Sequence, residues 1–318
     1  MTKLLFKGLS ALIILLGLVA CETDEAAKPT YLKIDAIHLS TNYAEQGSAH
    51  EQITTVWVNL NGQSVGAFEL PATIPLILDE GSNTLRLEAG INTNGIKSFR
   101  AINASFKPII LEVDGNNAGP IDTIIPDPSD LTVTYRDFYN VIVLEDFDKP
   151  GLNFERTNFS DTNFVKDGDS LFIFTPFGAS SPEPNTNSGL LVLDDLNPNA
   201  ELRSVVSYNI PAGVQNIYLE VTYRSNMDIG FGLIANYPTG NQSDVTAVVF
   251  PKAEWSKIYI NLVTEFQAFP GANGYQLLIR ARKPETISEG RIYLDNLKLV
   301  YEKWKNRLGK VSNTSFGM

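Results

Sequence analysis

Few side chains in this 318-residue chain have the types needed for covalent or metal chemistry: one cysteine, Cys21, and two histidines, His38 and His50. A single cysteine forms neither an intrachain disulfide nor a multi-cysteine zinc site, and two histidines do not make a three-histidine site. Neither histidine has a nucleophile-elbow pattern beside it. We therefore expect structural roles for both histidines and no catalytic set.

Cys21 stands directly after Leu18-Val19-Ala20, at the end of an apolar run that follows Lys3 and Lys7. The run is shorter than the about 20 residues that a membrane-spanning helix needs, and it has the features of a signal peptide. This segment resembles the signal of bacterial lipoproteins. The resemblance implies that residues 1–20 are a removed signal peptide. It also implies that acyl chains such as palmitate on Cys21 anchor the protein in a lipid bilayer.

Residues 21–28 form an acidic stretch that contains Glu22, Asp24 and Glu25. One interpretation is a solvated tether between the lipid and the folded body. The other follows from a resemblance to Bacteroidetes-type envelope lipoproteins, in which such a stretch directs the protein to the cell surface. The expected location is the cell envelope, at the outer membrane, and under the second interpretation the body is exposed outside the cell.

The chain is acidic, with a formal net charge of −11. Removal of residues 1–20 takes away two lysines and no acid, so the net charge becomes −13. This charge opposes nucleic acid as a partner, because binding to phosphates requires clustered lysine and arginine. It also opposes lying flat on anionic lipid. Neutral glycans, cations and other proteins remain as partners.

Residues 29–113 predict a small all-β domain, because short apolar runs alternate with turn signals. Asn61-Gly62 and Asn94-Gly95 are the strongest of these signals, since Asn-Gly is typical of the tight turn of a hairpin. About seven strands in this length favour an immunoglobulin-like sandwich.

Residues 114–131 are rich in Gly, Asn, Pro and Asp and lack alternation, so we predict a linker. Within it, Asp122-Thr123-Ile124 resembles the O-glycosylation site of Bacteroidetes envelope proteins. The resemblance implies a glycan on Thr123.

Residues 132–302 predict a larger all-β sandwich of the jelly-roll type, with ten strand-like runs that include Leu171–Thr175. The clearest alternation lies in 217–223 and 258–262. Residues 303–318 form a basic tail, for which we expect disorder.

The second domain begins with Leu144-Glu145-Asp146-Phe147-Asp148 and ends with Ile292-Tyr293-Leu294-Asp295. These stretches resemble the galactose-binding-like jelly roll of many carbohydrate-binding modules. The resemblance implies that the first and last strands lie side by side and share a structural calcium ion. It also implies that Glu145, Asp148 and Asp295 are its carboxylate ligands. The alternative is that these carboxylates are solvated at a sheet edge.

Two polar stretches are the candidates for ligand binding, because loops on a rigid sandwich commonly carry binding residues. In the first, Phe177 stacks on a sugar ring while Asn185 and Asn187 hydrogen-bond hydroxyl groups. In the second, the same roles fall to Tyr237, Asn241 and Gln242. The alternative is that both are plain solvated loops. We expect Trp255 to be a core anchor rather than a sugar platform.

These observations favour a non-catalytic envelope lipoprotein that binds glycan through its second domain. The strand motif Glu-x-Asp-x-x-Glu of jelly-roll glycosidases does not occur in the sequence. The alternative function is a structural or protein-binding subunit of an envelope complex.

Overall fold

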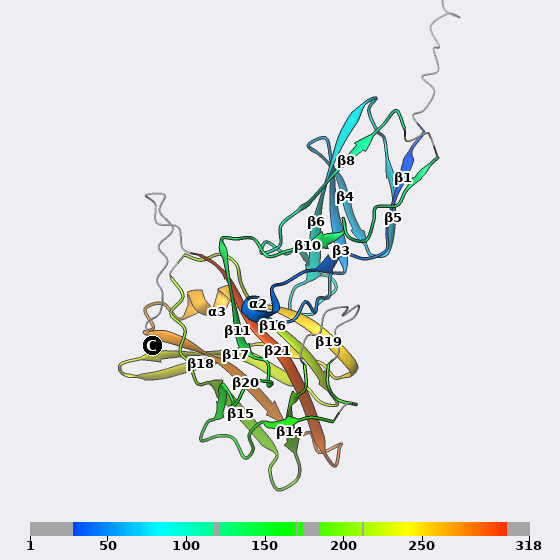
Figure 1. The fold of residues 1–318 in the computed structure, drawn as a ribbon. Helices are drawn as coiled ribbons and strands as arrows, with labels where there is room; N and C mark the ends of the chain where they lie inside the picture. Colours follow the sequence, from blue (N-terminus) through cyan, green and yellow to red (C-terminus); the bar gives the residue numbers. More distant parts are fainter. Residues whose placement is uncertain (1–27, 118–120, 170, 175–184, 212, 304–318) are drawn as a thin grey trace, which may run out of the picture.

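The computed structural model describes residues 28–117, 121–169, 171–174, 185–211 and 213–303, which form two β-sandwiches (Figure 1). Within these ranges the helices are short, α2 (Tyr43–Gln46) and α3 (Val263–Ala268). The predicted fold class, all-β with a smaller sandwich followed by a larger one, is confirmed. No helix in the described part of the chain is long and apolar enough to cross a membrane.

The first sandwich packs a three-stranded sheet against a larger one. The three-stranded sheet has the order β5 (Ala72–Leu76), β1 (Thr30–Ile34), β9 (Thr123–Ile124). The larger sheet has the order β4 (Gln63–Glu69), β3 (Thr55–Leu60), β6 (Ser82–Asn92), β7 (Arg100–Ile102), and β8 (Ile109–Asp114) also pairs with β6. The predicted hairpin at Asn61-Gly62 joins β3 to β4, with both turn residues at positive φ.

The stretch predicted as a linker takes part in the first sandwich instead. β9 lies within residues 114–131 and runs parallel to β1. β10 (Thr132–Val133), which the prediction placed in the second domain, runs parallel to β2 (His38–Leu39). The reason is a short alternation after the prolines: Leu131, Val133 and Tyr135 are buried in the core of the first sandwich, and Tyr139 still belongs to that core.

The second sandwich consists of a six-stranded and a five-stranded sheet. The six-stranded sheet has the order β13 (Val165–Asp167), β14 (Ser188–Leu193), β21 (Gly290–Glu302), β16 (Ile217–Ser225), β19 (Lys252–Asn261), and β11 (Tyr139–Glu145) also pairs with β21. The facing sheet has the order β12 (Phe154–Arg156), β15 (Asn199–Ser204), β20 (Gly274–Arg282), β17 (Ile229–Tyr237), β18 (Gly240–Val249).

The first and last strands of this sandwich lie side by side, as the resemblance implied. β11 pairs antiparallel with β21, Val141 opposite Val300. Both lie in the six-stranded sheet, in which β21 pairs with β11 along one edge and with β16 along the other (Figure 1).

Strand alternation gives the six-stranded sheet two distinct faces. On β16, Leu219 and Val221 point into the core between the two sheets, whereas Glu220 and Thr222 occupy the opposite face. We call that opposite face the outer face. The first sandwich covers part of the outer face, because Tyr218, Tyr259 and Val300 on this face belong to the apolar core of the first sandwich. The two sandwiches therefore share one continuous packed region.

Candidate functional site

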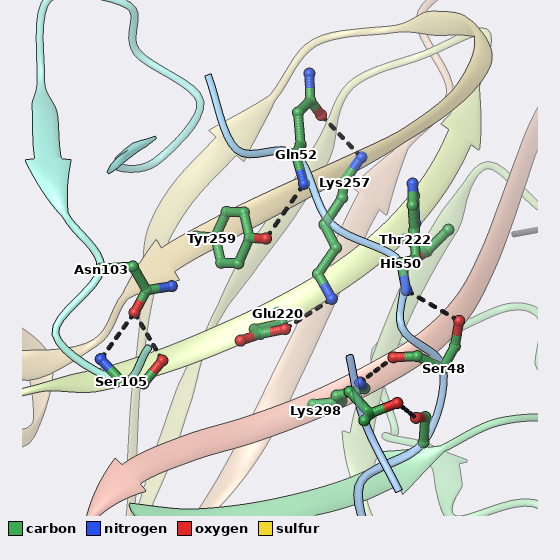
Figure 2. A network of polar contacts seen from close by, with 12 residues as sticks. Ser48, His50, Gln52, Asn103, Ser105, Glu220, Thr222, Lys257, Tyr259 and Lys298 are labelled. Carbon is green, nitrogen blue, oxygen red and sulfur yellow. Dashed lines mark hydrogen bonds and ion pairs between the residues drawn. The ribbon is translucent and has the colours of Figure 1, made fainter. Parts of the chain in front are cut away.

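The outer face is crossed by an extended segment of the first sandwich, residues 48–52, which connects β2 to β3. Every second residue of this segment contacts a different strand (Figure 2). The carbonyl oxygen of Ser48 accepts a hydrogen bond from Lys298 on β21. His50 Nδ1 lies 2.8 Å from Thr222 Oγ1 on β16.

Gln52 makes the third contact of this segment, with residues of β19. Its backbone N–H donates to the Tyr259 hydroxyl at 3.2 Å, and its Oε1 accepts from the Lys257 backbone N–H at 3.0 Å. The period of two between these contacting residues is that of an extended chain, so one side of the segment faces the sheet. Residues 48–52 therefore pack on the outer face and contact β21, β16 and β19 in turn.

A fully buried ion pair lies in the same layer. Lys257 Nζ is 2.7 Å from Glu220 Oε2, and both side chains are inaccessible to solvent. The Tyr135 hydroxyl, from the first sandwich, donates to the same carboxylate at 2.9 Å. Burial and the Glu220 charge raise the pKa of Tyr135 well above its ordinary value, so Tyr135 remains a donor. The side chains of the ion pair are inaccessible to solvent, which favours a structural role.

Beyond this layer, a chain of aromatic rings covers the outer face. The Phe174 ring lies 4.1 Å from the His50 ring and 5.9 Å from Trp255, centroid to centroid. Trp255 is 6.5 Å from Tyr293, and Phe172 stacks on Tyr293 at 4.7 Å with the planes 8° apart. The prediction of Trp255 as a core anchor is wrong, because its side chain is half-buried and belongs to neither apolar core.

A short turn places the two phenylalanines of this cluster. The sequence predicts a strand over Leu171–Thr175, but residues 171–174 form a turn and an irregular stretch. Asp169 explains the difference, since its carboxylate accepts from the Leu171 N–H at 3.0 Å and its carbonyl from the Phe172 N–H at 2.8 Å. Ser188 Oγ then donates to the Phe172 carbonyl at 3.0 Å, which fixes the turn on β14.

An open cavity of about 290 Å³ adjoins the Phe172–Tyr293 stack. The described residues that line it are Phe172, Arg224, Ser225, Asn226, Lys252, Ala253, Arg291 and Tyr293. Aromatic rings thus lie beside amide, hydroxyl and cationic groups, the combination of an apolar surface with a few polar groups that small-molecule sites have. We take this cavity as the candidate site.

Two arginines border the cavity. Arg224 is half-buried, and its guanidinium carbon lies 5.0 Å from the centroid of the Phe172 ring. Arg291 Nη1 donates to the Tyr293 hydroxyl at 3.4 Å, and its Nε pairs with Glu289. Both contacts raise the pKa of Arg291, so Arg291 is cationic throughout the physiological range.

The first predicted group of binding residues is partly near this cluster, but its described members bond to the protein itself. Asn185 Nδ2 donates to the Phe174 carbonyl at 2.6 Å and to Asp295 Oδ2 at 2.7 Å. The Asn187 N–H donates to Asp148 Oδ1 at 3.0 Å. Phe177 lies outside the described residues. Asn185 thus supports Phe174 rather than facing the cavity.

The second predicted group lies on the other sheet. Residues 236–242 are not a loop but the tight end of the β17–β18 hairpin, with Asn241 opposite Asn236 and Gln242 opposite Ala235. The Tyr237 hydroxyl donates to the Pro270 carbonyl at 3.2 Å. No contact among the described residues joins this hairpin to Asn185 or Asn187, so the two groups do not form one surface there.

The predicted calcium ligands divide into two groups. Glu145 is not suited to a metal, because its carboxylate accepts from the backbone N–H groups of Phe147 at 2.8 Å and of Asn153 at 2.6 Å. Asp148 Oδ2 and Asn185 Oδ1 are different, since both are buried without a hydrogen-bond partner among the described residues. They adjoin Asp295, whose pKa burial raises well above its ordinary value.

This part of the site fits a cation with a changed ligand set. Two carboxylates, Asp148 and Asp295, would be joined by the Asn185 amide oxygen, and calcium accepts such mixed oxygen ligands. Among the residues that the structure describes, no group of three or more His, Cys, Asp or Glu side chains is placed to hold a metal. The calcium site therefore stays a prediction, without Glu145.

The two predicted modification sites stay predictions as well. Thr123 is exposed on β9, which leaves its hydroxyl accessible to a glycan. Cys21 lies outside the described residues, so the structure gives no information about its lipid.

Sequence reasoning missed the residues that line the cavity, although strand alternation contained the signal. The alternation Ile217, Leu219, Val221 assigns Arg224 to the face opposite the core. The same rule assigns Tyr293 to that face between Ile292 and Leu294. What alternation does not give is which part of the face another domain covers.

No protein-family model matches the chain, and no curated protein matches it. Among solved structures, one carbohydrate-binding module of the β-sandwich superfamily is 13% identical, with 77% of this chain and 84% of that chain covered and a TM-score of 0.35. A family 30 carbohydrate-binding module of a Clostridium thermocellum cellulosomal cellulase is 14% identical over 50% of this chain and 96% of that chain, with a TM-score of 0.34.

A third solved structure, a carbohydrate-binding module specific for non-crystalline cellulose, is 11% identical over 50% of this chain and 93% of that chain, with a TM-score of 0.33. Likenesses at this level identify neither a ligand nor a binding residue in this chain. The site must be judged on its own geometry.

Proposed function

We propose that this protein binds carbohydrate, without cleaving it, in the cavity beside Phe172 and Tyr293. The single observation that supports this most is the pair of stacked rings next to hydrogen-bond donors at one open end of a rigid sheet. A sugar ring has an apolar face that packs on an aromatic ring and hydroxyl groups that need polar partners. The two arginines of the lining are placed to supply those partners, whereas Ser225 and Asn226 bond to the protein itself.

The size and lining of the cavity support binding of a short sugar segment. Its volume of about 290 Å³ lies at the lower end of ligand sites, which span about 300–1,000 Å³. Hydrolysis of a glycosidic bond by the usual route needs two carboxyl groups facing the substrate. The described lining contains neither Asp nor Glu, which favours binding over hydrolysis.

The rigid setting also supports binding. Trp255 contacts both Phe174 and Tyr293, and His50 of the first sandwich contacts Phe174. A platform whose rings are already packed loses little conformational freedom when a ligand arrives.

A glycan array followed by titration calorimetry tests the proposal on the full chain. We expect Phe172→Ala to weaken binding of the best glycan about fivefold or more, because the loss of aromatic stacking costs about 1 kcal/mol or more. Phe159→Ala is the matched control, since Phe159 is 77% exposed and lies outside the cavity. Equal affinity of the Phe172→Ala variant and the native chain would refute this site, and binding to no glycan would refute the function.

We further propose that lipid on Cys21 holds this glycan-binding body at a bacterial envelope membrane. The apolar run after Lys3 and Lys7 and the position of Cys21 support this. Mass spectrometry of protein from its native membrane is expected to show a chain that begins at an acylated Cys21. An unmodified Cys21, or an uncleaved residue 1–20 segment, would contradict the anchor while leaving the glycan site intact.

A further inference from the structure

The candidate cavity has the opposite charge to the protein around it. The chain carries 25 basic and 36 acidic residues. The described lining of the cavity nevertheless has three cations, Arg224, Lys252 and Arg291, and no carboxylate. A positive cavity in an acidic protein attracts an anionic ligand locally, while the remaining surface repels it.

The cations of the lining differ in whether a carboxylate of the protein pairs with them. Arg291 pairs with Glu289, which lies outside the lining. For Arg224, no carboxylate among the described residues lies within ion-pair distance. Arg224 Nη1 donates to the Leu171 carbonyl at 3.4 Å, near the limit of a hydrogen bond. The guanidinium of Arg224 thus retains most of its donors for another group.

Arg224 is also placed where an acidic sugar would need it. Arg224 and Tyr293 are directly opposite each other on β16 and β21. Side chains at such positions lie about 5 Å apart at their Cβ atoms, so the Arg224 side chain lies beside the stacked rings. A ring packed beside Phe172 would therefore place an exocyclic group next to the guanidinium, which lies 5.0 Å from that phenyl ring.

We infer that the ligand is an acidic glycan whose uronate carboxylate pairs with Arg224, with Lys252 and Arg291 adding positive charge. This inference rests on the proposed function and specifies its ligand class. A guanidinium binds a carboxylate through two parallel N–H···O bonds, and such charge-assisted bonds are about twice as strong as neutral ones. A neutral sugar would leave the donors of Arg224 with weaker hydroxyl partners.

The test compares uronate polymers with the same polymers after reduction of their carboxyl groups to alcohols. Polygalacturonate, alginate and hyaluronan serve as probes, each beside its carboxyl-reduced form, with the full chain in titration calorimetry. At least one acidic form is expected to bind at least tenfold more tightly than its reduced form, and the difference is expected to shrink as salt is raised.

Variants assign the effect to the cavity. Arg224→Gln is expected to lower affinity for the acidic polymer at least tenfold and affinity for the reduced polymer by a clearly smaller factor, because the glutamine amide still hydrogen-bonds a hydroxyl group. Arg282→Gln is the matched control, because Arg282 is an exposed arginine on β20, in the other sheet. Loss of binding in the Arg282→Gln variant as well would assign the effect to overall charge and overturn the inference.

The outcomes separate the two proposals. Equal binding of acidic and reduced polymers, abolished by Phe172→Ala, overturns the uronate inference and keeps the glycan function. Binding of neither form of any polymer, together with an empty glycan array, overturns both. Tighter binding of acidic forms that Arg224→Gln does not weaken places the carboxylate elsewhere and overturns the inference.

Discussion

The imidazole of His50 lies against the Phe174 ring and near two lysines, Lys257 and Lys298. Burial, followed by the charges of these lysines, holds its pKa well below the ordinary value. Glu220 is the anionic group in the same layer, and its charge is paired with Lys257. His50 is therefore neutral in the folded protein near pH 7 and for some distance below.

This shifted pKa predicts a loss of stability on acidification. Below pH of about 6.5 the unfolded chain binds a proton at His50 that the folded chain does not bind. The free energy of unfolding is thus expected to fall by up to about 1.4 kcal/mol per pH unit between pH about 6.5 and 5, on account of this one group. Urea unfolding at several pH values measures it.

The two histidines supply the test and its control. His50→Gln keeps a group that can hydrogen-bond Thr222 and is expected to reduce the pH slope, whereas His38→Gln is expected to retain it. A slope that is the same in the His50→Gln variant and the native chain would show that His50 does not titrate as argued.

Gly189 is a second residue with a defined physical role. A Cβ at this position on β14 would lie 2.1 Å from Cζ of Phe147, a fully buried ring that also packs against Phe164. We expect Gly189→Ala to destabilise the protein by about 3 kcal/mol, because a rigid buried ring must move. Gly168→Ala is the control, since a Cβ there would lie 3.4 Å from Asn187 Oδ1, and we expect it to change stability little. Thermal melts of both variants measure the difference.

At the scale of elements, the contacts of residues 48–52 explain why the outer face is only partly open. The sequence pattern does not indicate that Ser48, His50 and Gln52 each reach a strand of the second sandwich. Those partners lie far along the chain, as in the pair His50 and Thr222. Pairings of this kind depend on tertiary packing, which local patterns do not contain.

The buried ion pair of Glu220 and Lys257 permits a double-mutant test of this layer. Removing one partner leaves a buried charge without compensation, so Glu220→Gln alone and Lys257→Met alone are each expected to cost about 3–5 kcal/mol of unfolding free energy. The double variant is expected to cost less than the sum, with a coupling of about 2 kcal/mol or more. Strict additivity in urea unfolding would mean that the pair is not formed.

Turns were the features that the sequence predicted best. Asn61-Gly62 and Asn94-Gly95 both adopt positive φ, as their residue types require, but only Asn61-Gly62 is a tight hairpin, since residues 93–99 separate β6 from β7. The turn that ends β17 lacks such a pair, and residues 236–242 therefore read as a loop although they continue two long strands. Local turn chemistry was predictable, whereas the extent of pairing beyond it was not.

At the scale of the molecule, the class and the two-sandwich order followed from composition and alternation, but the boundary between sandwiches did not. β9 and β10 are short, and the prolines around them are typical of a linker. Only their pairing with β1 and β2 shows that they complete the first sandwich. The cavity was not predictable for the same reason, since it forms where the first sandwich stops covering the outer face.

The predicted calcium site has a consequence for the stability of the whole second sandwich. If Asp148, Asn185 and Asp295 bind calcium, saturation at about 100 times the dissociation constant adds about 2.7 kcal/mol to the free energy of unfolding. Thermal melts with excess calcium and then with chelator measure this shift. Asp148→Asn is expected to abolish it and the exposed Asp228→Asn to retain it; identical melts of the native chain with and without calcium would end the prediction.

The central claim is that a sugar binds beside Tyr293, and Trp255 reports on that position because its ring lies 6.5 Å from Tyr293. The chain has three tryptophans, so Trp57→Phe with Trp304→Phe leaves Trp255 as the single indole emitter. Titration of this variant with the best polymer of the panel is expected to change the Trp255 emission saturably, with the midpoint found by calorimetry. Calorimetric binding with no change in Trp255 emission would contradict the claim.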